Sequence, residues 1–197
     1  MSKDILAALR TATASRHEIL DSNMPLAQAE PTLADYRDHL GLLRDWLAPI
    51  EAWQARFSDG PQDSSLLPPA PHLPLIDADL RHASLQPRAA PDSGLQPAPM
   101  AGCAALNAED PAYRWGVSYV IEGSRLGGAV LHRRLAERLA PHPLRYLHAD
   151  GEAPGPRWQH FIRTLRAEVQ DDADIEAACA GACDAFDSLL ALHKAAA

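Results

Sequence analysis

Apolar residues recur at steps of three and four along most of this 197-residue chain, and no segment alternates apolar and polar residues as a strand does. The clearest case begins at Pro31-Thr32. Its helical stripe consists of Leu33, Tyr36, Leu40, Leu43, Leu47, Ile50 and Phe57. Thr32 and Asp35 resemble a capping box with Asp in place of Glu, and Pro49 is expected to kink this helix or end it one turn early. The sequence therefore predicts an all-α fold.

Further helices are expected from the same spacing, and their approximate ranges are 3–21, 76–84, 107–139, 158–169 and 175–190. Ser2 and either Asn107 or Asp110 are candidate N-caps, Pro111 suits a first helical position, and Pro141 is expected to stop that helix. Two segments, 58–74 and 85–100, are rich in proline and are predicted to be irregular. Neither half of the chain would form a convincing core alone, so residues 1–197 are predicted to form a single domain.

Composition excludes several classes of function. The net charge is −8 without a basic stripe, which argues against nucleic-acid binding. The apolar stretches are too short to span a membrane, and the first ten residues lack the apolar core of a secretory signal. Three cysteines, an odd number, do not predict a disulfide framework. We therefore expect a cytoplasmic, monomeric protein with no membrane partner. Cys179 and Cys183 share a helix face and are predicted to be small core residues.

A stripe of glycines is the most unusual feature of the helix after Pro111. Gly116, Val120, Gly123 and Gly127 follow at steps of four, three and four, with Gly128 beside them. Three glycines within six residues cost a helix roughly 3 kcal/mol relative to alanine, so something must compensate. Close helix–helix packing is one explanation, and spacing alone favours it. The other is that a flat ligand lies against bare backbone where the helix is broken at 123–128.

His17 falls on the apolar stripe of the first helix, which also contains Leu6, Leu9, Thr13 and Leu20. A single inward histidine is more often a core residue than a ligand. The other histidines show no spacing that would build a zinc or dinuclear site with it. One histidine ligand does suit haem, because the macrocycle supplies four further donors.

These segments together resemble the haem oxygenases, most closely the bacterial branch. The first helix, Leu9-Arg-Thr-Ala-Thr-Ala-Ser-Arg-His17, is similar to the family segment that supplies the iron ligand. The segment Tyr119-Val-Ile-Glu-Gly-Ser-Arg-Leu-Gly-Gly128 is similar to the bacterial pattern on the opposite haem face. The closing segments 158–161 and 182–190 fit less specifically, and 58–100 matches poorly.

The resemblance implies a single-domain helical bundle that sandwiches haem between the first helix and the glycine-rich helix. It implies cleavage of haem by dioxygen to biliverdin, ferrous iron and carbon monoxide, with haem as both cofactor and substrate. Electrons would come from an external reductase, since no GxGxxG fingerprint is present. His17 would bind the iron, while Gly123, Ser124 and Gly127 would serve catalysis. The implied haem-binding residues are Arg10, Gly123, Gly127, Gly128 and Arg163.

The chain departs from this pattern at several positions. Ala14 replaces a basic residue, Ser124 stands where mammalian-type members carry Asp, and Arg125 replaces the common Thr. Glu18 is a candidate to orient His17. These departures leave open a non-enzymatic haem-binding protein on the same fold. A di-iron enzyme is a weaker alternative, because no Glu-x-x-His is present among the candidate ligands. A third alternative is a purely structural interaction module, in which helix packing would be the only explanation for the glycines.

Overall fold

The computed structural model describes residues 4–70, 72–85, 109–149 and 154–196, and within these ranges every regular element is a helix. The α-helices are α1 (Ile5–Asn23), α2 (Leu33–Gln54), α3 (His72–Leu80), α4 (Pro111–Leu135), α5 (Arg145–His148), α6 (Pro154–Glu168) and α7 (Asp172–Ala196). Two 3₁₀ turns, η1 (Pro25–Ala27) and η2 (Gly60–Gln62), lie in the connections. The all-α prediction is confirmed for the described residues.

Local sequence signals set several helix ends. The Thr32 hydroxyl accepts the Asp35 N–H, and the Asp35 carboxylate accepts the Thr32 N–H, so the predicted capping box is confirmed. Asp110 caps α4 and Pro111 is its first residue, as predicted. Helix α2 continues through Pro49 and ends at Gln54, about one turn before Phe57, the last residue of the predicted stripe. Burial of Leu47 and Ile50 on either side of this proline holds the helix together.

Other boundaries differ from the sequence prediction. The N-cap of α1 is Asp4, while Ser2 lies outside the described residues. The short helix predicted over 76–84 is α3 and begins four residues earlier, inside the segment 58–74 that was predicted to be irregular. Helix α4 ends at Leu135, before the predicted end at Leu139. The single turn α5 was not predicted, because four residues carry too little periodicity to be recognised.

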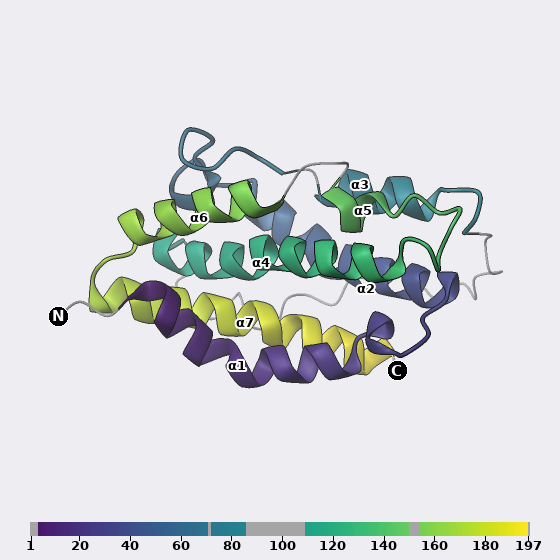
Figure 1. The fold of residues 1–197 in the computed structure, drawn as a ribbon. Helices are drawn as coiled ribbons and strands as arrows, with labels where there is room; N and C mark the ends of the chain where they lie inside the picture. Colours follow the sequence, from purple (N-terminus) through teal and green to yellow (C-terminus); the bar gives the residue numbers. More distant parts are fainter. Residues whose placement is uncertain (1–3, 71, 86–108, 150–153, 197) are drawn as a thin grey trace.

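Helix α4 is continuous from Pro111 to Leu135, so the prediction of a break at 123–128 was wrong. It lies along α7 in the middle of the molecule (Figure 1). The two helices approach closely through glycines on both sides. A Cβ added to Gly116 would collide with the Ala178 carbonyl, and one added to Gly181 would collide with the Tyr113 carbonyl. The packing explanation therefore accounts for Gly116.

Helix α1 also packs on α7, with further contacts to α6, whereas α1 and α4 contact each other little (Figure 1). Both helices thus lie on the same supporting helix. The core between the elements is apolar and includes Trp46, Trp115 and Phe161, each almost fully buried. No helix in the described part of the chain is both long enough and apolar enough to cross a membrane.

Candidate functional site

His17 lies on α1, two turns before the helix ends, and its side chain is 63% exposed. The other members of its predicted stripe are buried, namely Leu6, Leu9, Thr13 and Leu20. The prediction that His17 points into the core with them was therefore wrong. His17 lies at the edge of that stripe, and its imidazole centroid is 5.9 Å from that of Phe186 on α7. An exposed imidazole beside an apolar ring is accessible to a ligand.

Asp21, one turn after His17, is the carboxylate that orients the imidazole. Its Oδ2 lies 2.9 Å from the Nδ1 of His17. This contact engages Nδ1, which leaves Nε2 as the nitrogen that can bind a metal. Glu18 was a candidate either to orient His17 or to be a solvated side chain; it is exposed, and the contact with the imidazole is made by Asp21. The i,i+4 spacing of His17 and Asp21 is the signal that could have identified it.

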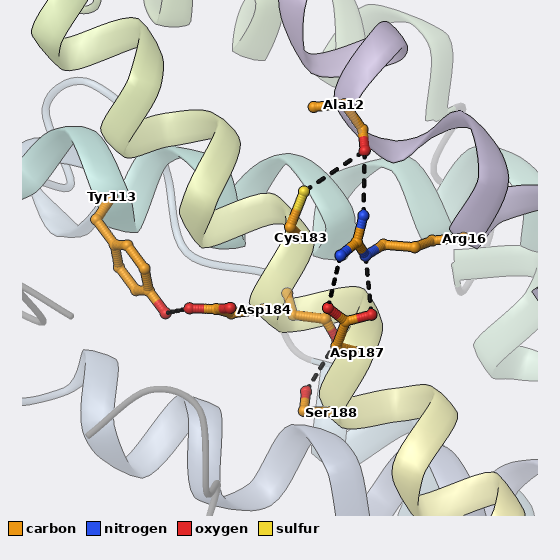
Figure 2. Close-up of polar contacts among 8 residues, drawn as sticks. Ala12, Arg16, Tyr113, Cys183, Asp184, Asp187 and Ser188 are labelled. Carbon is orange, nitrogen blue, oxygen red and sulfur yellow. Dashed lines mark hydrogen bonds and ion pairs between the residues drawn. The ribbon is translucent and has the colours of Figure 1, made fainter. Parts of the chain in front are cut away.

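An ion pair fixes the His17 turn to α7. The Nε and Nη2 of Arg16 each donate to one carboxylate oxygen of Asp187, both at 2.8 Å (Figure 2). The hydrogen bond with Asp187 raises the pKa of Arg16. Arg16 Nη1 and the Cys183 thiol both donate to the Ala12 carbonyl, at 3.3 and 3.5 Å. The segment that carries His17 is thereby tied to α7 at several points.

The cysteines of α7 are free thiols. Cys179 and Cys183 are half-buried rather than fully in the core, and burial raises the pKa of both. A raised pKa leaves them as thiols at neutral pH, and a thiol is a poor metal ligand and a poor nucleophile. They serve packing between α7 and α1.

Gly123 and Gly127 have a different environment from Gly116. A Cβ added to Gly127 would meet nothing within 4 Å, and one added to Gly123 would meet only the Trp158 ring, at 3.8 Å. Packing against another helix therefore does not explain these two glycines. Gly128 is different again, because its Cα faces the Leu147 backbone of α5 and it is buried. The helix presents bare, accessible backbone at Gly123 and Gly127.

Cationic and aromatic side chains lie near this part of α4. Arg10 of α1 is close enough to Tyr119 of α4 for its charge to act on the phenol, although burial is the larger effect and raises the pKa of Tyr119. Tyr119 also packs against Trp158, with ring centroids 5.6 Å apart. Arg163, the other predicted haem-binding cation, lies on the exposed side of α6. Tyr119 begins the second motif of the sequence, but no role was predicted for it.

Ser124 follows Gly123 and donates a hydrogen bond to the Ile121 carbonyl at 2.6 Å. Burial raises the pKa of Tyr146 of α5 to about 12. Arg125 is half-buried, and its charge acts on both Tyr146 and His72. Neither Tyr146 nor His72 had been predicted as part of the site, because both lie outside the two sequence motifs.

These residues fit haem better than a bare metal ion. Within the described ranges no three His, Cys, Asp or Glu side chains gather as metal ligands, so His17 is a single protein ligand of the kind that haem needs. The open backbone at Gly123 and Gly127 suits a flat macrocycle, because nothing fills the space a side chain would occupy. The residues present therefore accommodate this cofactor.

Comparison with known proteins agrees with this interpretation. The family model described as Heme oxygenase matches residues 3–194. A curated protein named "Heme oxygenase" from Xanthomonas campestris pv. campestris (strain 8004) is 42% identical over 77 residues, which is 38% of this chain and 46% of that protein. The chain thus covers less than half the length of that relative. No solved structure matches significantly. Since the family model covers nearly the whole sequence, the chain belongs to the heme oxygenase family.

Proposed function

We propose that this protein cleaves haem to biliverdin, ferrous iron and carbon monoxide, with dioxygen as the oxidant and electrons from an external reductase. One observation carries the proposal. An exposed histidine held by a carboxylate, His17 with Asp21, lies on α1, and open glycine backbone lies on α4. Both helices rest on α7 and contact each other little. A flat macrocycle between α1 and α4 would meet both features.

His17 is the proposed iron ligand, through Nε2. Asp21 accepts a hydrogen bond from Nδ1, which fixes the ring orientation and raises the basicity of the ligand nitrogen. The Arg16–Asp187 ion pair and the Phe186 ring hold this turn against α7. When bound, haem supplies the redox-active iron and is itself the molecule that is opened.

Gly123 and Gly127 are proposed to let the α4 backbone lie close to the haem face, where a side chain would obstruct access. Gly128 brings α5 against α4, with Leu147 packed on it. Ser124 is proposed to handle protons beside this face, because it follows Gly123 directly and carries a hydroxyl. Exclusion of bulk water by the aromatic pair Tyr119 and Trp158 would protect the reaction.

Arg10, Tyr119 and Arg163 are proposed to bind the haem propionates. A propionate is recognised by charge-assisted hydrogen bonds from guanidinium groups and by phenol donors. The proximity of Arg10 and Tyr119 supports this role for the pair. Arg163 is the weaker member, because it lies on the exposed side of α6. A cytoplasmic location and a monomeric state are part of the same proposal.

The second candidate function is non-enzymatic haem binding on the same fold. It is favoured by one observation: the Ser124 hydroxyl donates to the Ile121 carbonyl, so in this conformation its proton is already used within α4. A protein in which this hydroxyl stayed engaged would bind haem without supplying protons at its face.

The test is to add haemin to the purified protein, record the visible spectrum, and then add a reductase system or ascorbate in air. We expect a Soret band that His17→Ala alters, followed by decay to a biliverdin absorbance. Bound haem that persists under reductant and air would favour the second function. Absence of a Soret shift would refute both.

A further inference from the structure

Two histidines that the proposed function does not use lie next to each other where α5 packs on α4. His132 is in the last turn of α4 and is half-buried, while His148 is the last residue of α5 and is exposed. Their ring centroids are 4.7 Å apart, and the ring planes are inclined by 33°. Because the two imidazoles belong to different helices, only the fold brings them together.

The close approach of α4 and α5 sets the distance between these side chains. The two helices meet at Gly128, where an added Cβ would lie 3.5 Å from the carbonyl oxygen of Leu147 (Figure 1). His132 is one turn after Gly128 on α4, and His148 directly follows Leu147 on α5. Any larger residue at this contact would move the two helices, and therefore the two imidazoles, apart.

The single turn α5 is also anchored at its beginning. The fully buried carboxylate of Asp79 accepts the backbone N–H of Arg145 at 3.1 Å and that of Tyr146 at 2.9 Å. The backbone N–H of His148 donates to the Leu144 carbonyl at 3.0 Å. Both imidazoles are thus carried by fixed helical backbone, which keeps the geometry of a ligand pair well defined.

The distance between the rings fits one shared metal ion. An imidazole nitrogen binds Zn²⁺ at about 2.0–2.1 Å, which places each ring centroid about 3.2 Å from the ion. With centroids 4.7 Å apart, the two directions from the ion to the rings differ by about 95°. This angle lies between the right angle of octahedral coordination and the angle of about 109° in a tetrahedral site. One ion can therefore bind a nitrogen of each ring.

A histidine binds a metal only through a nitrogen with a free lone pair. Among the residues that the structure describes, none forms a hydrogen bond with the imidazole of His132 or of His148. Burial, and after it the neighbouring His148, lowers the pKa of His132, which favours the neutral imidazole that a metal requires. Both rings therefore have a nitrogen available.

A second histidine pair shows why the free lone pairs matter. The centroids of His82 and His142 are 4.8 Å apart, almost the same distance. However, Nδ1 of His142 accepts the backbone N–H of Leu144 at 3.0 Å, so its proton is on Nε2, which donates to the Asp79 carbonyl at 3.1 Å. His142 has no lone pair left for a metal. The spacing alone does not make a site, and this pair serves as an internal comparison.

We propose that His132 and His148 bind one divalent ion of a late first-row transition metal, such as Zn²⁺. Imidazole nitrogen suits these ions, whereas Mg²⁺ and Ca²⁺ prefer oxygen ligands. No group of three His, Cys, Asp or Glu side chains is found in the described part of the chain, so water completes the coordination. With two protein ligands, the ion is bound reversibly and joins α4 directly to α5. The site involves neither haem nor His17, and it is independent of the proposed function.

The main test is a calorimetric titration of zinc chloride into the haem-free protein, in a buffer that does not bind zinc. We expect one equivalent to bind, and His132→Ala and His148→Ala each to weaken binding at least about tenfold, since loss of a supporting residue alone costs that much. His82→Ala is the matched control and should keep the wild-type affinity, because its partner His142 has no free nitrogen. His17→Ala should also keep it, since His17 lies on α1.

Two further measurements identify the ligands and check the fold. Copper(II) binds imidazole sites more tightly than zinc, and pulsed electron paramagnetic resonance should detect two coordinated imidazoles in the wild type and one in H132A or H148A. Excess zinc should raise the Tm of the wild type, because the ion binds only the folded arrangement of α4 and α5. The Tm of H132A and H148A should not rise, while their circular dichroism without zinc should match the wild type.

The outcomes separate this site from its alternatives. Equal zinc affinity in the wild type, H132A and H148A would refute the proposal. Loss of binding in H17A but not in H132A would show that zinc binds the candidate iron ligand, which also refutes it. Loss in H132A and H148A with retention in H82A would support it. All these measurements are made without haem, so a protein that binds zinc here and never degrades haem would refute the proposed function alone.

Discussion

Arg16 and Asp187 form a two-point ion pair that joins α1 to α7 immediately beside the candidate iron ligand, with both N–O distances at 2.8 Å (Figure 2). The neighbours of these two residues, His17 and Phe186, also contact each other. The pair thus fixes the same turn of α1 that carries the imidazole. We expect this location, next to the candidate iron ligand, to make the pair matter for haem binding.

Replacing Arg16 by Ala should weaken haem binding more than it weakens the fold. The side chains of Arg16 and Asp187 are 30% and 52% exposed, so the loss in stability should stay below about 1 kcal/mol. The His17 turn loses its tether, and we expect several-fold weaker haemin binding in a Soret titration. Arg166→Ala removes a similar ion pair, with Asp4, far from His17, and should leave haem affinity unchanged. Equal affinities for the two variants would contradict the tethering role.

Asp21→Ala should lower haem affinity by on the order of tenfold, because removal of the carboxylate that orients a metal-bound histidine typically costs that much. The 2.9 Å contact with His17 Nδ1 identifies Asp21 as that carboxylate. Glu18→Ala is the matched control, since Glu18 is an exposed acid next to His17 on the same helix, whereas the contact with the imidazole is made by Asp21. Haemin titrations and the iron–histidine stretching frequency give the readout. A larger effect from Glu18 than from Asp21 would reverse the assignment.

Alanine at three glycines of α4 should separate packing from ligand access. Gly116→Ala is expected to destabilise the protein by about 1–3 kcal/mol, because its Cβ collides with the α7 backbone. Gly127→Ala has open space and should raise the stability of the haem-free protein by about 0.5–1 kcal/mol. Gly123→Ala should be tolerated, with its Cβ in ordinary contact with Trp158. Urea denaturation measures all three.

The same variants should differ in haem chemistry. If macrocycle and backbone meet at Gly127, an added methyl there should slow biliverdin formation even though the fold is more stable. Normal turnover by G127A would place the haem elsewhere. Higher stability together with slower biliverdin formation in G127A would not be expected if Gly127 served packing alone.

His39 should make the fold sensitive to mild acid. Burial lowers its pKa to about 4, and its Nδ1 is buried without a partner. The unfolded chain, with a histidine pKa near 6.5, binds the proton first. The free energy of unfolding therefore falls as the pH drops from about 6.5 to about 4, and His39 lowers it by about 1.4 kcal/mol per pH unit over this range. Urea denaturation across this range should show a shallower pH dependence in His39→Leu, and parallel curves would contradict this assignment.

Helix positions were largely predictable because their causes are local. The capping box of Thr32 and Asp35 and the Asp110–Pro111 start of α4 rest on residues within one turn. The single turn α5, which was not predicted, depends on a distant group. The N–H groups that begin α5 are held by Asp79, more than sixty positions away in the chain. The spacing of apolar residues along the chain cannot predict such a long-range contact.

The candidate site also combines features that the sequence predicts with features that only the fold decides. The sequence by itself determined which residues share a helix face: His17 with its neighbours on α1, and the glycine stripe of α4. Only the tertiary structure decided how each is used. In the fold, His17 is exposed beside Asp21, Gly116 packs against α7, and Gly127 faces open space. These outcomes depend on which helix covers each face. Side-chain spacing along a helix is fixed by the backbone repeat, whereas what meets each face is fixed by packing between segments far apart in the chain.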